Sequence, residues 1–318
     1  MSRAASRVVL GSAALATALS LTACASTESS TAPAADSMDE PDDGRVEVDA
    51  PQPRLVVATD VGVVVLDPAD GTVLDSFETA TQPAPVVAGD GRHVFLVQRE
   101  ADRTQVLDAG TWAAEHGDHA HYYVADPALR DVEVQGVEPV HVVSHDGRTA
   151  IFHDGDGTAT LFRDAGLRID SLDEAVLDTG APHHGVVVPL AAGAVVSIPP
   201  PTGDDTLPTG VTVVDEDGAE VVRFDDCPGL HGEAAVGNML AFACSDGVLL
   251  VEGEHAHKVD YPGGDGRVGS FTAGPVGDYL VGNYTATSLL ALHVETATAH
   301  EITVDLPYAA RVYDEHGE

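Results

Sequence analysis

The chain has 318 residues, with 15 Lys and Arg against 52 Asp and Glu, and its formal net charge is -37 at pH 7. Such a field repels the phosphates of nucleic acids and attracts cations, so we exclude nucleic acid as a partner.

The first 23 residues predict a lipoprotein signal peptide. Arg3 and Arg7 flank the start of an apolar segment from Val8 to Leu21, and the run Leu21-Thr-Ala-Cys matches the bacterial lipobox. The apolar run is too short and too rich in Ala and Ser for a membrane-spanning helix. We expect cleavage before Cys24 and lipidation of its thiol. An ordinary signal peptide followed by a chance cysteine is the alternative.

Residues 24–50 predict a disordered acidic tether. They are mostly Ser, Thr, Ala, Pro, Asp and Glu, and such a segment does not bury enough apolar surface to order itself. Its acidic residues between 39 and 43 are better explained by a solvated linker than by a metal site.

Residues 51–318 predict an all-β domain. Short apolar runs such as Leu55–Thr59, Val61–Leu66 and Thr72–Glu78 alternate with Gly, Asp and Pro, as is typical of strands joined by tight turns. Asp170–Val176 is the best candidate for a helical segment.

The strand pattern also repeats. Similar openings recur at Pro85, Pro139, His184, His231 and Val268, at a spacing of roughly forty to fifty-five residues that is typical of propeller blades. We therefore predict a β-propeller of about six to seven four-stranded blades. A strand starting at Leu306 either helps to close the ring or begins a blade that is incomplete at the C-terminal end.

Three of these repeats carry a histidine near the same point. In a propeller the first strand of each blade lines the central channel, so His141, His184 and His231 are expected to form a ring. Three imidazoles suit Zn²⁺, which takes three or four ligands in a tetrahedral arrangement. The alternative is that each is a polar residue on a wet strand face.

Neighbouring residues are candidates for the same site. His183 is a further ligand candidate, although a regular strand points it away from His184. Glu233 is expected to orient a histidine from behind. His145 is a second supporting candidate; it lies roughly 13 Å along the strand from His141, so we place it in the turn.

A second histidine cluster lies in an expected loop between the second and third blades. His116, His119 and His121, together with Asp118, make a flexible metal-binding arm. A surface loop with accidental histidines is the alternative.

Cys227 and Cys244 are the remaining cysteines after Cys24. Outside the cytoplasm two such cysteines usually form a disulfide. Because they flank His231, they are alternatively zinc ligands.

Sequence signatures of enzymes are missing. There is no Gly-x-Ser-x-Gly, no phosphate-binding glycine loop and no dinucleotide fingerprint. We therefore expect a protein that is not an enzyme.

Five motifs, in order, resemble the AztD family of periplasmic zinc chaperones over residues 54 to about 306. They are His116-Gly-Asp-His, Pro139-Val-His-Val-Val-Ser-His-Asp-Gly-Arg, Thr179-Gly-Ala-Pro-His-His-Gly-Val, Cys227-Pro-Gly-Leu-His-Gly-Glu-Ala and Cys244-Ser-Asp-Gly-Val-Leu-Leu-Val. Members of this family are β-propellers that bind zinc and pass it to the solute-binding protein of a zinc ABC importer. The resemblance places its metal role on His119, His121, His141, His184 and His231.

The resemblance also shapes the expected biology. Family members continue further, so it implies a propeller shortened at the C-terminal end. With Cys24 lipidated, we expect an extracytoplasmic zinc chaperone on the outer face of the cell membrane, touching the membrane only through its anchor. A protein-interaction scaffold without obligatory metal is the main alternative. A metal-dependent lactonase ranks last, because such sites use oxygen ligands around a harder ion.

Overall fold

A computed structural model describes residues 44–117, 119–201, 207–263, 265–273 and 278–304. The predicted signal peptide with Cys24, most of the predicted tether, Asp118 and the strand predicted at Leu306 lie outside the described residues. No helix in the described ranges is long and apolar enough to span a membrane. The two helices found there are short 3-10 turns, η1 (Arg99–Ala101) and η2 (Asp164–Ile169), so the all-β prediction is confirmed.

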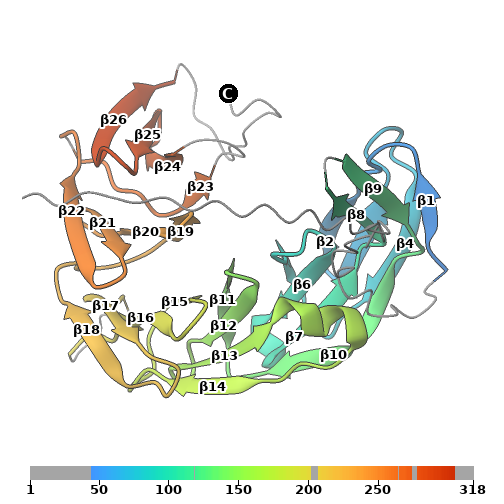
Figure 1. Cartoon of the computed structure of the whole chain (residues 1–318), viewed down its shortest axis with the longest axis horizontal. Helices are drawn as coiled ribbons and strands as arrows, with labels where there is room; N and C mark the ends of the chain where they lie inside the picture. Colours follow the sequence, from blue (N-terminus) through green and yellow to red (C-terminus); the bar gives the residue numbers. More distant parts are fainter. Residues whose placement is uncertain (1–43, 118, 202–206, 264, 274–277, 305–318) are drawn as a thin grey trace, which may run out of the picture. The chain divides into compact units, whose positions relative to one another are not determined.

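Six antiparallel sheets repeat along the described chain, and we call them blades 1 to 6 in chain order (Figure 1). Blade 1 has three strands and each of the others has four. Their strands are β2 (Leu55–Thr59), β3 (Gly62–Leu66) and β4 (Val73–Glu78) in blade 1; β5 (Ala84–Val87), β6 (His93–Gln98), β7 (Arg103–Asp108) and β10 (Ala128–Gln135) in blade 2; β11 (Pro139–His145), β12 (Arg148–His153), β13 (Thr158–Arg163) and β14 (Ala175–Asp178) in blade 3; β15 (Val187–Pro189), β16 (Ala194–Ile198), β17 (Gly210–Val214) and β18 (Glu220–Phe224) in blade 4; β19 (Glu233–Val236), β20 (Met239–Ala243), β21 (Gly247–Glu252) and β22 (His255–Asp260) in blade 5; β23 (Phe271–Ala273), β24 (Tyr279–Thr285), β25 (Ser288–His293) and β26 (Thr298–Thr303) in blade 6.

The three strands predicted at the start of the domain are present as β2, β3 and β4. The helical segment predicted at Asp170–Val176 is wrong. The short helix η2 ends before it, and Val176 pairs with Thr160 of β13 instead. Because that pairing satisfies the backbone from Ala175 onward, the segment joins a sheet.

The hydrophobic core is divided among the junctions between successive blades. Five clusters of buried side chains join blades 1 and 2, 2 and 3, 3 and 4, 4 and 5, and 5 and 6. At the second junction Phe95 and Phe162 pack edge to face with ring centroids 5.9 Å apart. The inner strands β6, β16 and β17 are buried along their whole length. Burial on both faces explains why these runs are apolar without alternation.

A further three-stranded sheet, which we call the hairpin sheet, contains β8 (Thr111–His116), β9 (His119–Val124) and β1 (Val46–Val48), in the order β1-β9-β8. Its hairpin interrupts blade 2 between β7 and β10, so the predicted loop between the second and third blades is wrong in both place and structure. The Ala125 N–H donates to the Gly110 carbonyl at 2.9 Å and closes the base of the hairpin.

Strand β1 lies within the segment predicted to be the tether. Val46, Glu47 and Val48 pair in register with Val124, Tyr123 and Tyr122 of β9. Residues 46–48 of the predicted tether therefore form a strand, because this alternating Val-Glu-Val segment gains a partner strand that is distant in sequence.

Candidate metal centres

Three predicted ligand histidines come together from three successive blades, and we call His141, His184 and His231 the inner trio. His141 lies within β11, whereas His184 and His231 lie shortly before β15 and β19, the first strands of blades 4 and 5. Their candidate ligand nitrogens all lie within 4.8 Å of one another. The inner trio therefore gathers the histidines that the repeat aligns.

The backbone holds His231 in place although it lies outside a strand. The His231 N–H donates to the Ala243 carbonyl at 2.9 Å, and the Ala243 N–H donates to the Gly232 carbonyl at 2.9 Å. Gly232 has a φ of +98°, and a Cβ there would lie 2.7 Å from the Gly269 carbonyl oxygen. Only glycine fits this position without strain. The same Gly269 carbonyl accepts a hydrogen bond from Nδ1 of His231 at 2.8 Å.

In the other two imidazoles of the inner trio, Nδ1 also faces a hydrogen-bond acceptor, which in both cases is a carboxylate. Nδ1 of His141 lies 3.3 Å from Oε1 of Glu233, and Nδ1 of His184 lies 2.7 Å from Oδ2 of Asp154. Ionised carboxylates and carbonyls only accept, so Nδ1 carries the proton in each ring and Nε2 carries the lone pair. Metal-binding histidines normally have such a partner on their second nitrogen.

The geometry of the inner trio fits zinc. The Nε2 atoms of His141 and His184 face each other at 3.2 Å, and two lone pairs at that distance repel unless a cation or an added proton joins them. Two nitrogens bound to one tetrahedral zinc at 2.0–2.1 Å lie about 3.3 Å apart. The ring of His231 stacks beside His184 with centroids 5.2 Å apart and supplies the third nitrogen.

The charges around the inner trio also favour a cation. Burial lowers the pKa of His141, but the hydrogen bond and charge of Glu233 outweigh it and raise that pKa above its ordinary value. Burial raises the pKa of Asp154, but hydrogen bonds from His184 and Arg99 lower it overall, which favours the ionised form. Oε2 of Glu233 and Oδ1 of Asp154 are buried without a hydrogen bond in the described part of the chain. A bound dication stabilises such carboxylates.

Asp154 is a supporting residue that the sequence analysis missed. Its Oδ2 also accepts a hydrogen bond from Nη1 of Arg99 at 2.8 Å, and Nη2 of Arg99 donates to Glu138 at 2.6 Å. These residues border a pocket of about 330 Å³ together with His184. The spacing of Asp154, Arg99 and Glu138 along the sequence does not predict this group, because Arg99 belongs to blade 2 and contacts the other two only through tertiary packing.

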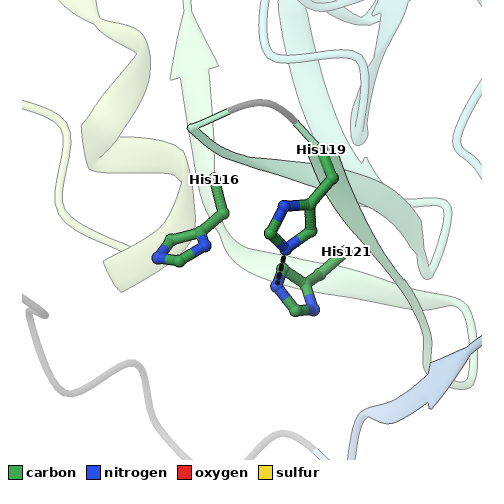
Figure 2. A group of neighbouring side chains, drawn as sticks. All are labelled: His116, His119 and His121. Atoms are coloured by element: carbon green, nitrogen blue, oxygen red, sulfur yellow. Dashed lines mark hydrogen bonds between the residues drawn. The ribbon is translucent and has the colours of Figure 1, made fainter.

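The second cluster, which we call the outer trio, consists of His116, His119 and His121 in the hairpin sheet (Figure 2). His116 pairs directly with His119 across the hairpin, and His121 follows His119 on the same face because side chains alternate along a strand. The ligand nitrogens lie within 4.8 Å of one another. The Nε2 atoms of His119 and His121 are 3.2 Å apart.

The outer trio lies in a more open setting than the inner one. His116 and His119 are exposed and His121 is half-buried. Nδ1 of His121 lies 2.6 Å from Oε1 of Glu47 on β1, so this ring also presents Nε2 to its neighbours. Glu47 was placed in the tether by sequence analysis, and only the pairing of β1 with β9 brings it here.

His183 and His145 join neither trio. His183 is buried, with Nδ1 donating to the Ala181 carbonyl at 2.7 Å and Nε2 lying 2.8 Å from Oγ of Ser197; burial lowers its pKa. The ring of His145, at the end of β11, lies between the carbonyls of Pro189 and Gly237, at 2.9 and 3.0 Å. Both rings are held by blade-to-blade or core contacts.

The two predicted partner cysteines adjoin the inner trio. The sulfur atoms of Cys227 and Cys244 are 2.00 Å apart, and their Cα atoms are 4.9 Å apart. Cys227 lies in the loop between β18 and β19 that carries His231, and Cys244 directly follows β20. The pair therefore lies at disulfide distance beside that loop.

Comparisons with known proteins follow the same lines. No family model matches the chain. Over 241 residues the chain is 32% identical to the zinc chaperone AztD of Citrobacter koseri, covering 73% of this chain and 57% of AztD. The chain therefore spans little more than half the length of that relative.

Solved structures add the fold. The crystal structure of C. koseri AztD superimposes with a TM-score of 0.76 at 29% identity, covering 82% of this chain and 72% of that one. The apo form of C. koseri AztD gives 0.73 at 27% identity, covering 80% and 71%. Sqt1 from Chaetomium thermophilum, 14% identical with a TM-score of 0.50 and coverage of 78% and 67%, shares the fold alone.

Repeated four-stranded sheets and these structural matches define a β-propeller that gathers imidazoles in two places. By sequence and by fold, the chain is a homologue of AztD. The predicted fold class and the predicted resemblance are both confirmed.

Proposed function

We propose that the protein is a zinc chaperone that carries Zn²⁺ as cargo and delivers it to the solute-binding protein of a zinc ABC importer. The inner trio is the observation that carries this proposal: three imidazoles converge, each with Nδ1 hydrogen-bonded and Nε2 directed toward the others. The homology to a zinc chaperone supports the same cargo. Neither trio implies a reaction, and we propose a role that is not enzymatic.

Each trio has its own part in this proposal. His141, His184 and His231 hold one zinc ion, and Glu233 and Asp154 orient two of those rings. His116, His119 and His121 hold a second, more accessible ion. Asp118, between His116 and His119, stays a predicted ligand. His183 and His145 have other partners and are left out of both sites.

Location and covalent structure are part of the proposal. We place the protein outside the cytoplasm, held to the outer face of the cell membrane by lipid on Cys24 and free of other membrane contact. We also propose a Cys227–Cys244 disulfide. The bridge would close a loop with a sequence separation of 17, which on the chain-entropy model stabilises by about 3 kcal/mol. Mass spectrometry of the protein from its native envelope tests both modifications.

Zinc titration of the purified protein tests the cargo. We expect two classes of site and complete loss of tight binding when both trios are replaced by alanine. A matched variant that removes His255, His257 and His293, which lie outside both trios, should bind as the parent does. Tight binding that survives loss of both trios would contradict the proposal.

Transfer tests the chaperone role. Zinc-loaded protein should fill an apo solute-binding protein faster than the same concentration of zinc presented by a chelator of equal affinity. If the two proteins associate equally well with and without zinc, and no zinc moves, an interaction scaffold would be the better assignment.

A further inference from the structure

We infer that Glu47 is a positioning residue for the outer trio, so that the N-terminal strand β1 takes part in holding zinc at the hairpin sheet. This inference rests on the proposed function. It begins with the register of β1 on β9, in which Glu47 pairs with Tyr123. Tyr123 and His121 lie on the same face of β9, and Oε1 of Glu47 reaches Nδ1 of His121 at 2.6 Å.

The chemistry of this contact matches what the inner trio does. A carboxylate that accepts from Nδ1 leaves Nε2 of His121 without a proton, and that atom lies 3.2 Å from Nε2 of His119. Glu233 and Asp154 make the same contact with His141 and His184. In all three places a carboxylate lies behind an imidazole whose other nitrogen faces a second histidine.

The contact is too exposed to be explained by fold stability. The Glu47 side chain is 58% exposed and that of His121 is 36% exposed, and exposed ion pairs contribute little to folding. The pairing of β1 with β9 uses backbone groups, which a change of the Glu47 side chain leaves intact. Its effect is therefore expected on metal binding and not on the stability of the sheet.

The experiment measures zinc at the outer trio alone. In the full chain, His141, His184 and His231 are replaced by alanine, and zinc affinity is compared for this parent and for added Glu47→Ala and Glu47→Gln. We expect Glu47→Ala to weaken binding about 10- to 100-fold, the usual effect of losing such a partner. Glu47→Gln, whose amide oxygen still accepts a hydrogen bond, should lose less. Asp49→Ala removes the same charge from an exposed position beside β1 and should leave affinity unchanged.

Two further readouts separate positioning from structure. The visible spectrum of bound Co²⁺ should change with Glu47→Ala and stay the same with Asp49→Ala, while the thermal unfolding midpoint stays the same in both. If the parent folds poorly, the same variants are compared in the chain with an intact inner trio, by the zinc-binding class that is lost when the outer trio is replaced by alanine. Unchanged affinity and spectrum in Glu47→Ala would overturn the inference alone. A parent that binds no zinc at the outer trio would overturn the inference together with the proposed second site.

Discussion

Single carboxylates determine which nitrogen each histidine offers. Glu233 and Asp154 occupy Nδ1 of His141 and His184, and a neutral imidazole has only one proton to place. Without such a partner the proton is free to move to Nε2, where it competes with a metal ion. At the proposed zinc site the carboxylates would therefore act on the ion through the tautomer of the ring and through their charge.

This reasoning gives a prediction for the inner trio. Asp154→Asn and Glu233→Gln should each lower zinc affinity at that trio by about 10- to 100-fold, because the charge behind the ring is lost. Competition titration with a chelator measures the change. Asp156→Asn, an exposed change two residues from Asp154, serves as the control. Equal affinities in all three variants would show that the carboxylates have no part in binding.

A second prediction concerns stability and pH at Asp90. Burial raises the pKa of Asp90, but the hydrogen bond and charge of His93 and two backbone N–H donors outweigh it and lower the pKa to about 2. A carboxyl group with a lowered folded-state pKa stabilises the fold above its unfolded pKa of 3.8. That stabilisation is lost as pH falls from about 4 to about 2.

The corresponding variant is Asp90→Asn. The Asp90 side chain is 7% exposed, so solvent does little to screen the interactions that lower its pKa. We therefore expect Asp90→Asn to lower the free energy of unfolding at pH 7 by about 2 kcal/mol. Urea unfolding at pH 7 and at pH 2.5 measures it. The difference from the parent should shrink at the lower pH. A difference of the same size at both values would mean that ionisation of Asp90 is not the cause.

Sequence reasoning was uneven at the level of single residues. The repeat placed His141, His184 and His231 at equivalent points, and Glu233 could be predicted as a supporting residue because it lies two residues after His231. Asp154 and Glu47 could not be predicted, since each contacts its histidine across a long sequence separation. His183 looked like a ligand only until its partners in the core were known.

Among the elements, the hairpin β8–β9 has its own means of attachment. Trp112 is buried at its base, where it stacks on Tyr123 with centroids 5.5 Å apart and meets the guanidinium of Arg92 at 3.6 Å. Arg92 in turn pairs with the buried carboxylate of Asp108 at 2.7 Å. The base is thus fixed to blade 2, whereas the histidines lie toward the tip.

Because base and tip are separate, the tip can be removed alone. Replacing residues 115–120 by Asn-Gly joins Ala114 to His121, which are directly paired, by a two-residue turn suited to a hairpin. This change removes two histidines of the outer trio and should abolish the outer zinc site while the inner site keeps its affinity. Calorimetric titration counts the sites, and circular dichroism checks the fold. Two intact classes of site would contradict the assignment of the outer trio.

Element prediction succeeded where the signal was local. β-branched runs between turn residues identified β2, β3 and β4. It failed where a partner strand decided the outcome: Asp170–Val176 is partly taken up by β14, the histidine loop is a hairpin inside blade 2, and Val46–Val48 is a strand. A single sequence contains no direct record of these long-range pairings.

In the whole molecule, the two trios differ in what they connect. The inner trio draws one histidine from each of blades 3, 4 and 5, whereas the outer trio belongs to a single hairpin. An ion on the inner trio therefore links three blades whose cores are also joined by apolar packing. An ion on the outer trio links only two neighbouring strands.

Zinc should therefore stabilise the propeller mainly through the inner trio. At a free zinc concentration of 100 times the dissociation constant, binding to the folded state alone adds about 2.7 kcal/mol. Thermal unfolding with and without zinc should show this gain in the parent and in a variant lacking the outer trio. The gain should be smaller in a variant lacking the inner trio, in which only an ion on the outer trio remains to stabilise the folded state. A gain that follows the outer trio instead would reverse the assignment.

The contact between Gly110 and Ala125 has a consequence for how such proteins diversify. This hydrogen bond brings the two ends of residues 111–124 together before β10 begins. We therefore expect blade 2 to keep the same four strands whether this segment is long, short or absent. Gain or loss of the outer histidines thus requires one insertion or deletion and no redesign of a blade. A chain without these histidines therefore needs no change in β5, β6, β7 or β10, the four strands of blade 2.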